Sequence, residues 1–256
     1  MFFRRIKDHL RNDNWFAVAV DFLVVVGGVG IALWAESTIR MQSTEADIAA
    51  LEQTLAQERL SIYLNAAERV SLSDCRVQRI GVLTDALLES DGNWPGMPLE
   101  GAQNSGFRTY VPMAWLEPIK RYPIHSWDAA LSQGLIGSMS QDRVAILSAF
   151  FAAVEALVEF QAASNDLATR VQVLSLDMNM SPETKVDFLR LLSELDHNSA
   201  IAEIAAQQVK ALAEAAGMGL TADQAALLKT QLDRTNAIAI QSVGECFEPI
   251  STAFLE

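Results

Sequence analysis

The sequence predicts an all-α protein in which one transmembrane helix precedes an extracytoplasmic, antiparallel helical bundle. Three observations lead to this prediction. An apolar run fills residues 15–35, near the N-terminus. Apolar residues then recur at helical spacing through most of the chain, and helix-capping signals divide the helical segments. Proline and glycine concentrate in one stretch, residues 91–123, and no strand-like alternation of any length is present.

The run WFAVAVDFLVVVGGVGIALWA, residues 15–35, has the length and composition of a membrane-spanning helix. From Trp15 to Trp34 it extends roughly 28 Å at about 1.5 Å per residue, close to the hydrocarbon thickness of a bilayer. Its Val, Leu, Ile and Phe residues together favour insertion by about 3–7 kcal/mol, whereas Asp21 costs about 3 kcal/mol at most. A cleaved signal peptide is the alternative, but Trp34 occupies the cleavage-like site, where a small residue is expected. The sequence therefore favours an uncleaved anchor in the lipid bilayer.

The charges beside this anchor predict its orientation. The stub, residues 1–14, carries four Lys and Arg against two Asp, whereas the twenty residues after the anchor carry one Arg against four acids. The positive-inside rule places the stub in the cytoplasm and residues 36–256 on the far side. For a bacterial protein, this is a single-pass inner-membrane topology with a periplasmic domain.

Residues 36–256 are strongly acidic. They hold 15 Lys and Arg against 29 Asp and Glu, which gives a net charge of −14. This charge disfavours nucleic acid and anionic lipid surfaces as partners and favours solubility. The Leu- and Ala-rich composition, with seven prolines in the whole chain, predicts a helix-rich globular domain.

The N-terminal pattern resembles that of a group of bacterial proteins. RRIKDHLRNDNW, then AVDFLVVVGGVGIAL, then Trp34 and Glu36, is similar to bacterial single-span membrane proteins of no established activity. The likeness is clearest over residues 1–40 and fainter around Cys75-Arg76 and residues 127–134. The resemblance implies a basic stub, an acid-containing anchor and a helical extracytoplasmic domain. It implies no catalytic residue.

After the anchor, helical spacing continues to about residue 90, with a restart predicted at Ser73. Polar residues interrupt the seam that a long two-stranded coiled coil would need, so the helix is expected to pack on its own domain. These residues are Glu58, Asn65 and Arg69.

Residues 91–123 hold five of the seven prolines, which predicts an irregular loop. Its five aromatic residues indicate that the loop is packed onto the domain. Long ordered loops are often functional, which makes this stretch the best candidate for a partner surface. The alternative is a structural plug, which we favour for Trp94 and Trp115. The candidate partner residues are Phe107, Tyr110, Lys120, Arg121 and Tyr122.

Capping signals predict the remaining helices. Helices are expected to begin at Ser126, at Ser140 (running to about Leu176), at Ser181-Pro182-Glu183 (ending at Gly217 or Gly219) and at the capping box of Thr221 with Gln224 (running at least to Val243).

Cys75 and Cys246 are the two cysteines, and both follow the anchor. An oxidising compartment would let them form a disulfide, which we favour over the alternative of two buried thiols. Their spacing excludes a CxxC redox motif.

Within the anchor, Ala17, Asp21, Gly28 and Ala32 fall on one helical face. The motif from Gly28 to Ala32 lets two helices approach closely, and an acid on that face would point at a partner helix and away from lipid. In the alternative, Asp21 extends to the cytoplasmic interface and the glycines are ordinary for a membrane helix, and the sequence leaves both alternatives open. The first alternative predicts a homo-oligomer or a larger membrane complex.

No catalytic, metal or cofactor constellation is recognisable. His9 lies in the stub, His197 lacks a second ligand at helical spacing, and His125 beside Lys120 and Arg121 is more typical of a solvated loop end than of an anion site. The sequence therefore predicts a non-enzymatic scaffold or accessory subunit of an envelope or membrane protein complex, without a cofactor. The alternative is a periplasmic helical domain that binds or senses a small molecule, and an enzyme ranks third.

Overall fold

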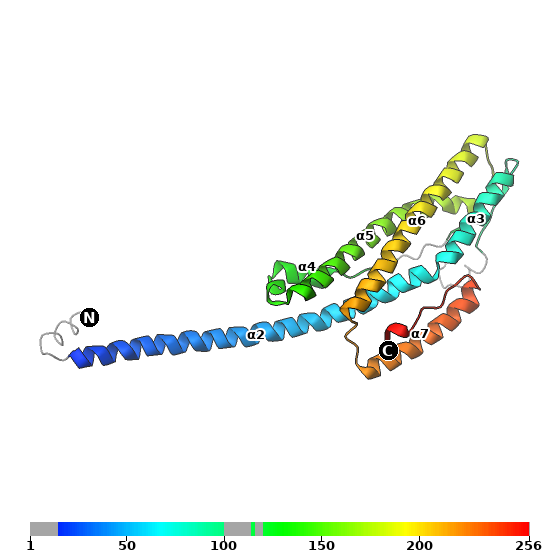
Figure 1. Cartoon of the computed structure of the whole chain (residues 1–256). Helices are drawn as coiled ribbons and strands as arrows, with labels where there is room; N and C mark the ends of the chain where they lie inside the picture. The colour runs from blue at the N-terminus through cyan, green and yellow to red at the C-terminus, as the bar shows by residue number, and fades with distance from the viewer. Residues whose placement is uncertain (1–14, 100–113, 116–119, 256) are drawn as a thin grey trace. The chain divides into compact units, whose positions relative to one another are not determined.

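The computed structural model describes residues 15–99, 114–115 and 120–255 (Figure 1). Most of these residues are helical, which confirms the all-α class. The helices are α2 (Trp15–Ser71), α3 (Ser73–Glu89), α4 (His125–Ser132), α5 (Gln141–Val171), α6 (Pro182–Ala216) and α7 (Ala222–Val243). Short 3-10 helices are η2 (Leu135–Ser138), η3 (Gln172–Ser175) and η4 (Ala253–Leu255).

The chain divides into two compact units, residues 1–51 and residues 52–256, and α2 contributes to both. The helix has no break at residue 35, where the sequence places the end of the anchor. The restart predicted at Ser73 is confirmed, because α3 begins there after a turn at Leu72.

The core of the second unit is built on α5 and α6, which run side by side, with α3 against α6 (Figure 1). One cluster of fully buried side chains joins α3, the end of α5 and the start of α6. It includes Leu83, Leu87, Val171, Leu174 and Leu195. Further along the same helices, the ring of Trp127 from α4 stacks on that of Phe151 with centroids 5.1 Å apart. The apolar stripes of the helices thus face one another along their length.

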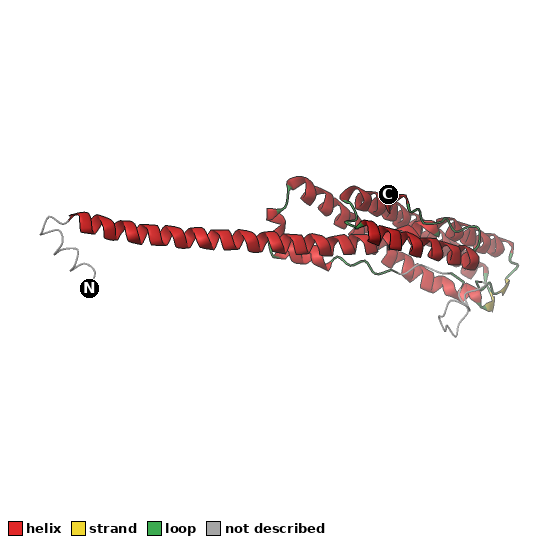
Figure 2. Cartoon of the chain, turned by 90° about the horizontal axis from the view of Figure 1, so that it is seen from below, coloured by secondary structure: helices red, strands yellow, loops and turns green. Residues whose placement is uncertain are grey.

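Two short strands depart from the sequence-based expectation of no strand. β1 (Asn93–Pro95) and β2 (Asp177–Asn179) pair antiparallel, with Trp94 opposite Met178 (Figure 2). Three-residue strands are too short to show an alternating pattern in the sequence. Contacts with neighbouring segments stabilise this pair. The indole Nε1 of Trp94, which is fully buried, donates to the carbonyl of Leu174 at 2.8 Å.

Gly96 lets the chain leave β1 close to η3. Its φ is +69°, a region that L side chains rarely adopt. A Cβ at this position would lie 2.8 Å from the carbonyl oxygen of Ser175 and 2.9 Å from the carbonyl carbon of Leu176. Gly96 is therefore required both by its backbone angle and by the close approach of two backbone segments.

Three of the four predicted helix starts are confirmed by their caps. The side chains of Ser140, Ser181 and Thr221 accept backbone N–H groups of α5, α6 and α7, and Thr221 with Gln224 forms the predicted capping box. The fourth is wrong: α4 begins at His125, and Ser126 lies inside it. The Ser126 hydroxyl is instead directed to α2, where it donates to Glu58 Oε1 at 2.6 Å.

The C-terminal segment after α7 is fastened to α2 and α3. Cys75 and Cys246 form a disulfide with their Cα atoms 4.9 Å apart, within the separation of about 7 Å that a bridge requires. Beyond it, the amide of Glu248 donates to the carbonyl of Ser71 at 2.9 Å. Near the end of the chain, the ring of Phe254 lies 4.2 Å from that of Tyr63. The tail therefore lies along α2 as part of the domain.

Candidate functional site

The stretch of α2 from Phe22 to Trp34 carries large apolar side chains that no other part of the described chain covers. Phe22 is 67% exposed and Trp34 is 70% exposed, and the Val, Leu and Ile residues between them are also exposed. Thirteen residues of an α-helix make more than three turns, so these side chains point in every direction around the axis. A helix that is apolar all round requires a partner or a membrane as its surroundings.

The small-residue face of this stretch is open. Beyond the adjoining residues and backbone of the helix itself, no described heavy atom lies within 4 Å of a Cβ built at Gly27, Gly28 or Gly30, and Ala32 is exposed. Asp21 and Ala17 lie in the helix, but their side chains are outside what the structure describes. The predicted stripe of Ala17, Asp21, Gly28 and Ala32 is thus free of contacts at the glycine and alanine positions that are described.

Among the described residues, the apolar stretch Phe22–Glu36 is a shorter helix, and the segment that is long and apolar enough to cross a membrane by length and composition is Gln141–Ser175. It comprises α5 and η3, and one side of it is fully buried in the second unit through Leu147, Phe150, Val154 and Leu157. The same side also buries the polar side chains of Gln161 and Ser164. These contacts are those of a central helix in a folded domain.

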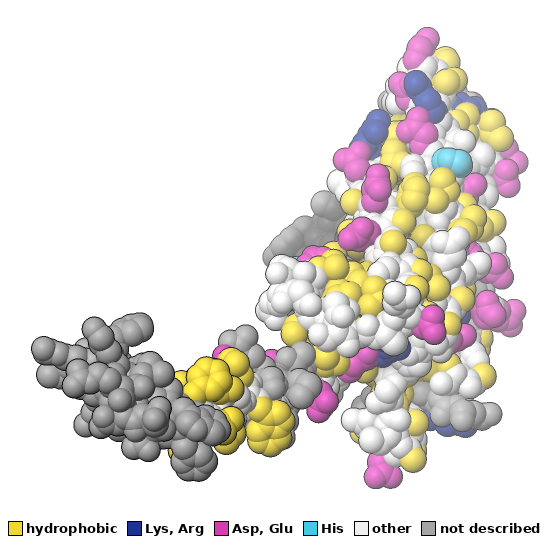
Figure 3. Space-filling model, turned by 60° about the vertical axis from the view of Figure 1, so that its left-hand side comes forward, with side chains coloured by type: hydrophobic (Ala, Val, Ile, Leu, Met, Phe, Trp, Pro, Cys, Tyr) yellow, Lys and Arg dark blue, Asp and Glu magenta, His cyan; other side chains and the backbone are white. Residues whose placement is uncertain are grey.

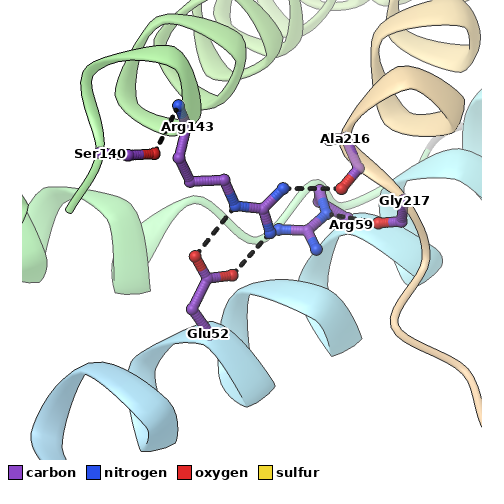
Figure 4. Close-up of polar contacts among 6 residues, drawn as sticks. All are labelled: Glu52, Arg59, Ser140, Arg143, Ala216 and Gly217. Atoms are coloured by element: carbon purple, nitrogen blue, oxygen red, sulfur yellow. Dashed lines mark hydrogen bonds and ion pairs between the residues drawn. The ribbon is translucent and has the colours of Figure 1, made fainter. Parts of the chain in front are cut away.

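Two arginines and one glutamate meet where α6 ends (Figure 4). Arg143, from the first turn of α5, binds Glu52 in a bidentate pair, with Nε–Oε1 at 2.9 Å and Nη2–Oε2 at 2.6 Å. Its third nitrogen, Nη1, donates to the carbonyl of Ala216 at 2.7 Å. Arg59 lies beside it, and its Nε donates to the carbonyl of Gly217 at 3.1 Å. We call Glu52, Arg59 and Arg143 the arginine cluster.

The local sequence explains this meeting. Glu52 and Arg59 are seven residues apart on α2, which is two helical turns, so they share one face. The Ser140 side chain accepts the backbone N–H of Arg143 at 3.3 Å and thereby sets the first turn of α5. The carbonyls of Ala216 and Gly217 are left without intrahelical partners at the end of α6, and the two guanidinium groups bind them.

The arginine cluster holds one carboxylate for two guanidinium groups. Burial, and then the positive charge of Arg143, lower the pKa of Arg59 to about 10. The hydrogen bonds from Arg143 lower the pKa of Glu52. Arg59 is 1% exposed, and its Nη1 has no hydrogen-bond partner among the described residues. The cluster therefore carries a formal charge of +1 inside a protein whose net charge is −13.

A cleft of about 660 Å³ opens over the arginine cluster. One wall is α2, the other is the first half of α7, and the linker between α6 and α7 closes one side. We call it the α2–α7 cleft. It is lined by the arginine cluster and by Gln53, Ala56, Gln57, Leu60, Ala216, Gly217, Met218, Gly219, Leu220, Thr221, Gln224, Leu227, Leu228 and Gln231.

A smaller cleft of about 380 Å³ lies between the end of α6 and the C-terminal tail. Tyr63 lines it and donates its hydroxyl proton to Glu214 Oε1 at 3.0 Å. Burial, together with the hydrogen bond and charge of Glu214, raises the pKa of Tyr63. Of the residues in the 91–123 stretch that the structure describes, none lines either this cleft or the α2–α7 cleft.

The sequence-predicted partner loop is only partly described. Phe107 and Tyr110 lie outside the described residues, and Tyr122 is buried. The Lys120 ammonium is 2.6 Å from Glu68, and the carbonyl of Arg121 accepts from Asn65 Nδ2 at 3.1 Å. Trp94 and Trp115, which the sequence analysis assigned to a structural plug, lie in the core.

The predicted histidines are separated. His125 is exposed in the first turn of α4, and His197 is exposed on α6. Within the described ranges, no group of three His, Cys, Asp or Glu side chains is placed to hold a metal ion. The face shown in Figure 3 carries Asp and Glu side chains scattered over its surface, in line with the acidic composition.

Sequence reasoning did not find the arginine cluster. The sequence does carry one signal: Arg59 lies at helical spacing between the apolar residues Leu55 and Ile62. Both of these are fully buried on the same side of α2. Glu52 and Arg143 give no such signal, because their pairing depends on the tertiary fold.

Comparisons with protein-family models, with curated proteins and with solved structures find no match to this chain. The function is therefore inferred from the geometry of the chain itself.

Proposed function

We propose that this chain is a membrane-anchored, non-enzymatic interaction protein, a scaffold or accessory subunit of an envelope or membrane protein complex. Residues 15–35 insert into the bacterial inner membrane with the stub in the cytoplasm, and the helical domain lies in the periplasm. The observation that carries this proposal is the uncovered apolar stretch of α2 from Phe22 to Trp34.

The energetics of that stretch support the anchor. Full burial of one large apolar side chain contributes about 1.5–3 kcal/mol. Nine such side chains between Phe22 and Trp34 are between 49% and 70% exposed. Their exposure to water therefore costs on the order of 10 kcal/mol, comparable with the whole stability of a typical domain. The interior of a bilayer removes this cost on every side of the helix at once.

The disulfide supports the periplasmic side. A bond between Cys75 and Cys246 persists in an oxidising compartment and is rare in the cytoplasm of mesophiles. Both cysteines follow the anchor in the sequence, on the side that the distribution of Lys and Arg assigns to export. Two independent features thus favour the same topology.

Membrane insertion is tested by extraction of native membranes with alkaline carbonate, which removes peripheral proteins. The natural chain should stay in the membrane, and a variant with Val24→Lys and Val26→Lys should be lost from it, because each lysine costs about 2.5–3.5 kcal/mol at the centre of a membrane helix. The matched control is Val186→Lys with Ile204→Lys, two exposed apolar residues of α6. Extraction of the natural chain, or equal loss of both double variants, would refute the anchor.

The interaction role is tested at the open small-residue face. Gly28→Leu fills the space that a partner helix would use and should abolish crosslinking to that partner, while Leu23→Val should leave it intact. Asp21→Asn should weaken the association modestly, since polar contacts between membrane helices average below about 1 kcal/mol. Unchanged crosslinking and co-purification of Gly28→Leu would remove the main support for a scaffold.

Orientation is tested with a reporter fused after Glu256. A reporter that matures only in the exported compartment should be active there. Activity of a reporter that works only in the cytoplasm would overturn the topology.

A further inference from the structure

We propose that the α2–α7 cleft binds a small monocarboxylate with an apolar body, whose carboxylate is held by Arg59 and Arg143. This inference is independent of the anchoring role, because every residue that carries it lies in the second unit. It rests on the unbalanced positive charge of the arginine cluster, on the apolar residues of the cleft walls and on the start of α7 beside the cleft.

The unbalanced charge selects an anion. Both oxygens of Glu52 are bound by Arg143. Within the described part of the chain, the Arg59 guanidinium makes one hydrogen bond, to a neutral carbonyl, and its Nη1 has no partner. A buried donor without a partner destabilises the fold, and a charged one does so more strongly. An incoming carboxylate that accepts from Arg143 brings a negative charge beside Arg59 and neutralises the charge of the cluster.

Arg143 makes the cluster reachable from the cleft. Its side chain is 25% exposed, and it keeps N–H groups that neither Glu52 nor Ala216 uses, since a guanidinium has five. A carboxylate beside Arg143 and Arg59 would therefore receive charge-assisted hydrogen bonds from groups that are already positioned. In Figure 4, the two guanidinium groups lie next to each other above Glu52.

The charge count favours a monoanion over a dianion. One negative charge brings the arginine cluster from +1 to zero, whereas a doubly charged phosphate would leave it negative within an acidic protein. The first turn of α7 lines the cleft at Thr221 and Gln224, and the positive end of this 22-residue helix adds to the attraction for an anion.

The cleft walls supply apolar contacts for the rest of the ligand. Leu60 comes from α2, Met218 from the linker, and Leu227 and Leu228 from α7. Leu227 is 62% exposed, so its side chain leaves apolar area available to a ligand. A volume of about 660 Å³ lies within the range of about 300–1,000 Å³ that is typical of small-molecule sites.

The test measures binding of radiolabelled hexanoate to the full chain in lipid nanodiscs by equilibrium dialysis, with empty nanodiscs as the blank. Hexanoate should bind saturably at one site per chain. Hexanamide, which has the same shape and no charge, should compete at least about tenfold more weakly, because a hydrogen bond to a charged group contributes about 1.5–3 kcal/mol. Acetate should also compete weakly, because it lacks the apolar body.

Three variants distinguish binding in the α2–α7 cleft from binding elsewhere on the surface. Arg143→Gln removes the accessible guanidinium and should weaken hexanoate binding about tenfold. Leu227→Asp changes an exposed wall residue, so it leaves the fold intact and should weaken binding as much. Ile238→Asp is the matched control, since Ile238 is 54% exposed on the same helix and lies outside the cleft. Far-UV circular dichroism and an intact disulfide verify that each variant is folded.

The proposal is overturned if hexanoate shows no saturable binding above the blank. It is also overturned if hexanamide or acetate competes as well as hexanoate. Equal effects of Leu227→Asp and Ile238→Asp would show that binding depends on general surface charge, and full binding by folded Leu227→Asp would place the ligand elsewhere.

Discussion

Replacing Gly96 by alanine should destabilise the helical domain far more than the same change at Gly134. Both glycines have a left-handed backbone, with φ of +69° and +73°. The strain of an L residue there is about 1–2 kcal/mol at either position. The surroundings differ: a Cβ at Gly134 meets no atom within 4 Å, whereas a Cβ at Gly96 meets backbone atoms of Ser175, Leu176 and Asp177 at 2.8–3.0 Å.

Because these neighbours are backbone, no side chain can rotate to relieve the contact at position 96. β1 must move away from the segment after η3, and two hydrogen bonds to the carbonyl of Leu174 are then lost, from the Met97 amide at 2.8 Å and from Trp94 Nε1 at 2.8 Å. At about 1 kcal/mol each, added to the backbone strain, the loss is about 3–4 kcal/mol for Gly96→Ala. Gly134→Ala should lose about 1–2 kcal/mol.

Urea unfolding of the two variants and the natural chain, followed by far-UV circular dichroism, gives the free energies of unfolding directly. A loss for Gly96→Ala within about 0.5 kcal/mol of that for Gly134→Ala would refute the close approach of β1 to η3.

Three further predictions concern charge, the disulfide and the buried indole. The pKa of Glu52 is lowered in the folded state, so its contribution to stability is present above the ordinary carboxyl pKa and is lost as the pH falls through the folded value. Glu52→Gln should therefore lower the free energy of unfolding at pH 7 but not in acid, as measured by urea unfolding across pH. A difference between the two proteins that stays constant with pH would contradict the Arg143–Glu52 pairing. Replacing both Cys75 and Cys246 by serine should lower the free energy of unfolding by about 2–5 kcal/mol, because the disulfide closes a loop with a sequence separation of 171 residues. An unchanged denaturation midpoint would show that the disulfide does not form in the natural protein. Trp94→Phe should lose about 1 kcal/mol through the indole hydrogen bond, because the Leu174 carbonyl keeps the Met97 amide as a donor. A neutral result in calorimetry would contradict this hydrogen bond.

Helix boundaries were predictable where their cause is local. Ser140, Ser181 and Thr221 each accept an N–H group three residues ahead, so the whole signal lies within four residues of sequence. Ser126 has the same residue type but makes a contact with Glu58, 68 residues away, and no local pattern distinguishes the two situations.

Features that join distant segments could not be predicted in the same way. The β1–β2 pair unites residues about 84 positions apart, and each strand is too short for periodicity to register. In the arginine cluster, Arg143 is 91 residues from Glu52 and 73 from Ala216. In the sequence, Glu52 and Arg143 look like ordinary surface charges, and the packing of α2, α5 and α6 brings them beside the buried Arg59.

The fastening of the C-terminal tail has a consequence for how the protein is made. A ribosome completes Cys75 171 residues before Cys246, and Phe254, which packs beside Tyr63, follows later still. Until then, α2 and α3 have neither their covalent partner nor the amide of Glu248 that binds Ser71. This part of the domain therefore stays open until the chain has grown past residue 246, and chains that stop before that residue would keep Cys75 as an unpaired thiol that the oxidising compartment can couple to other thiols.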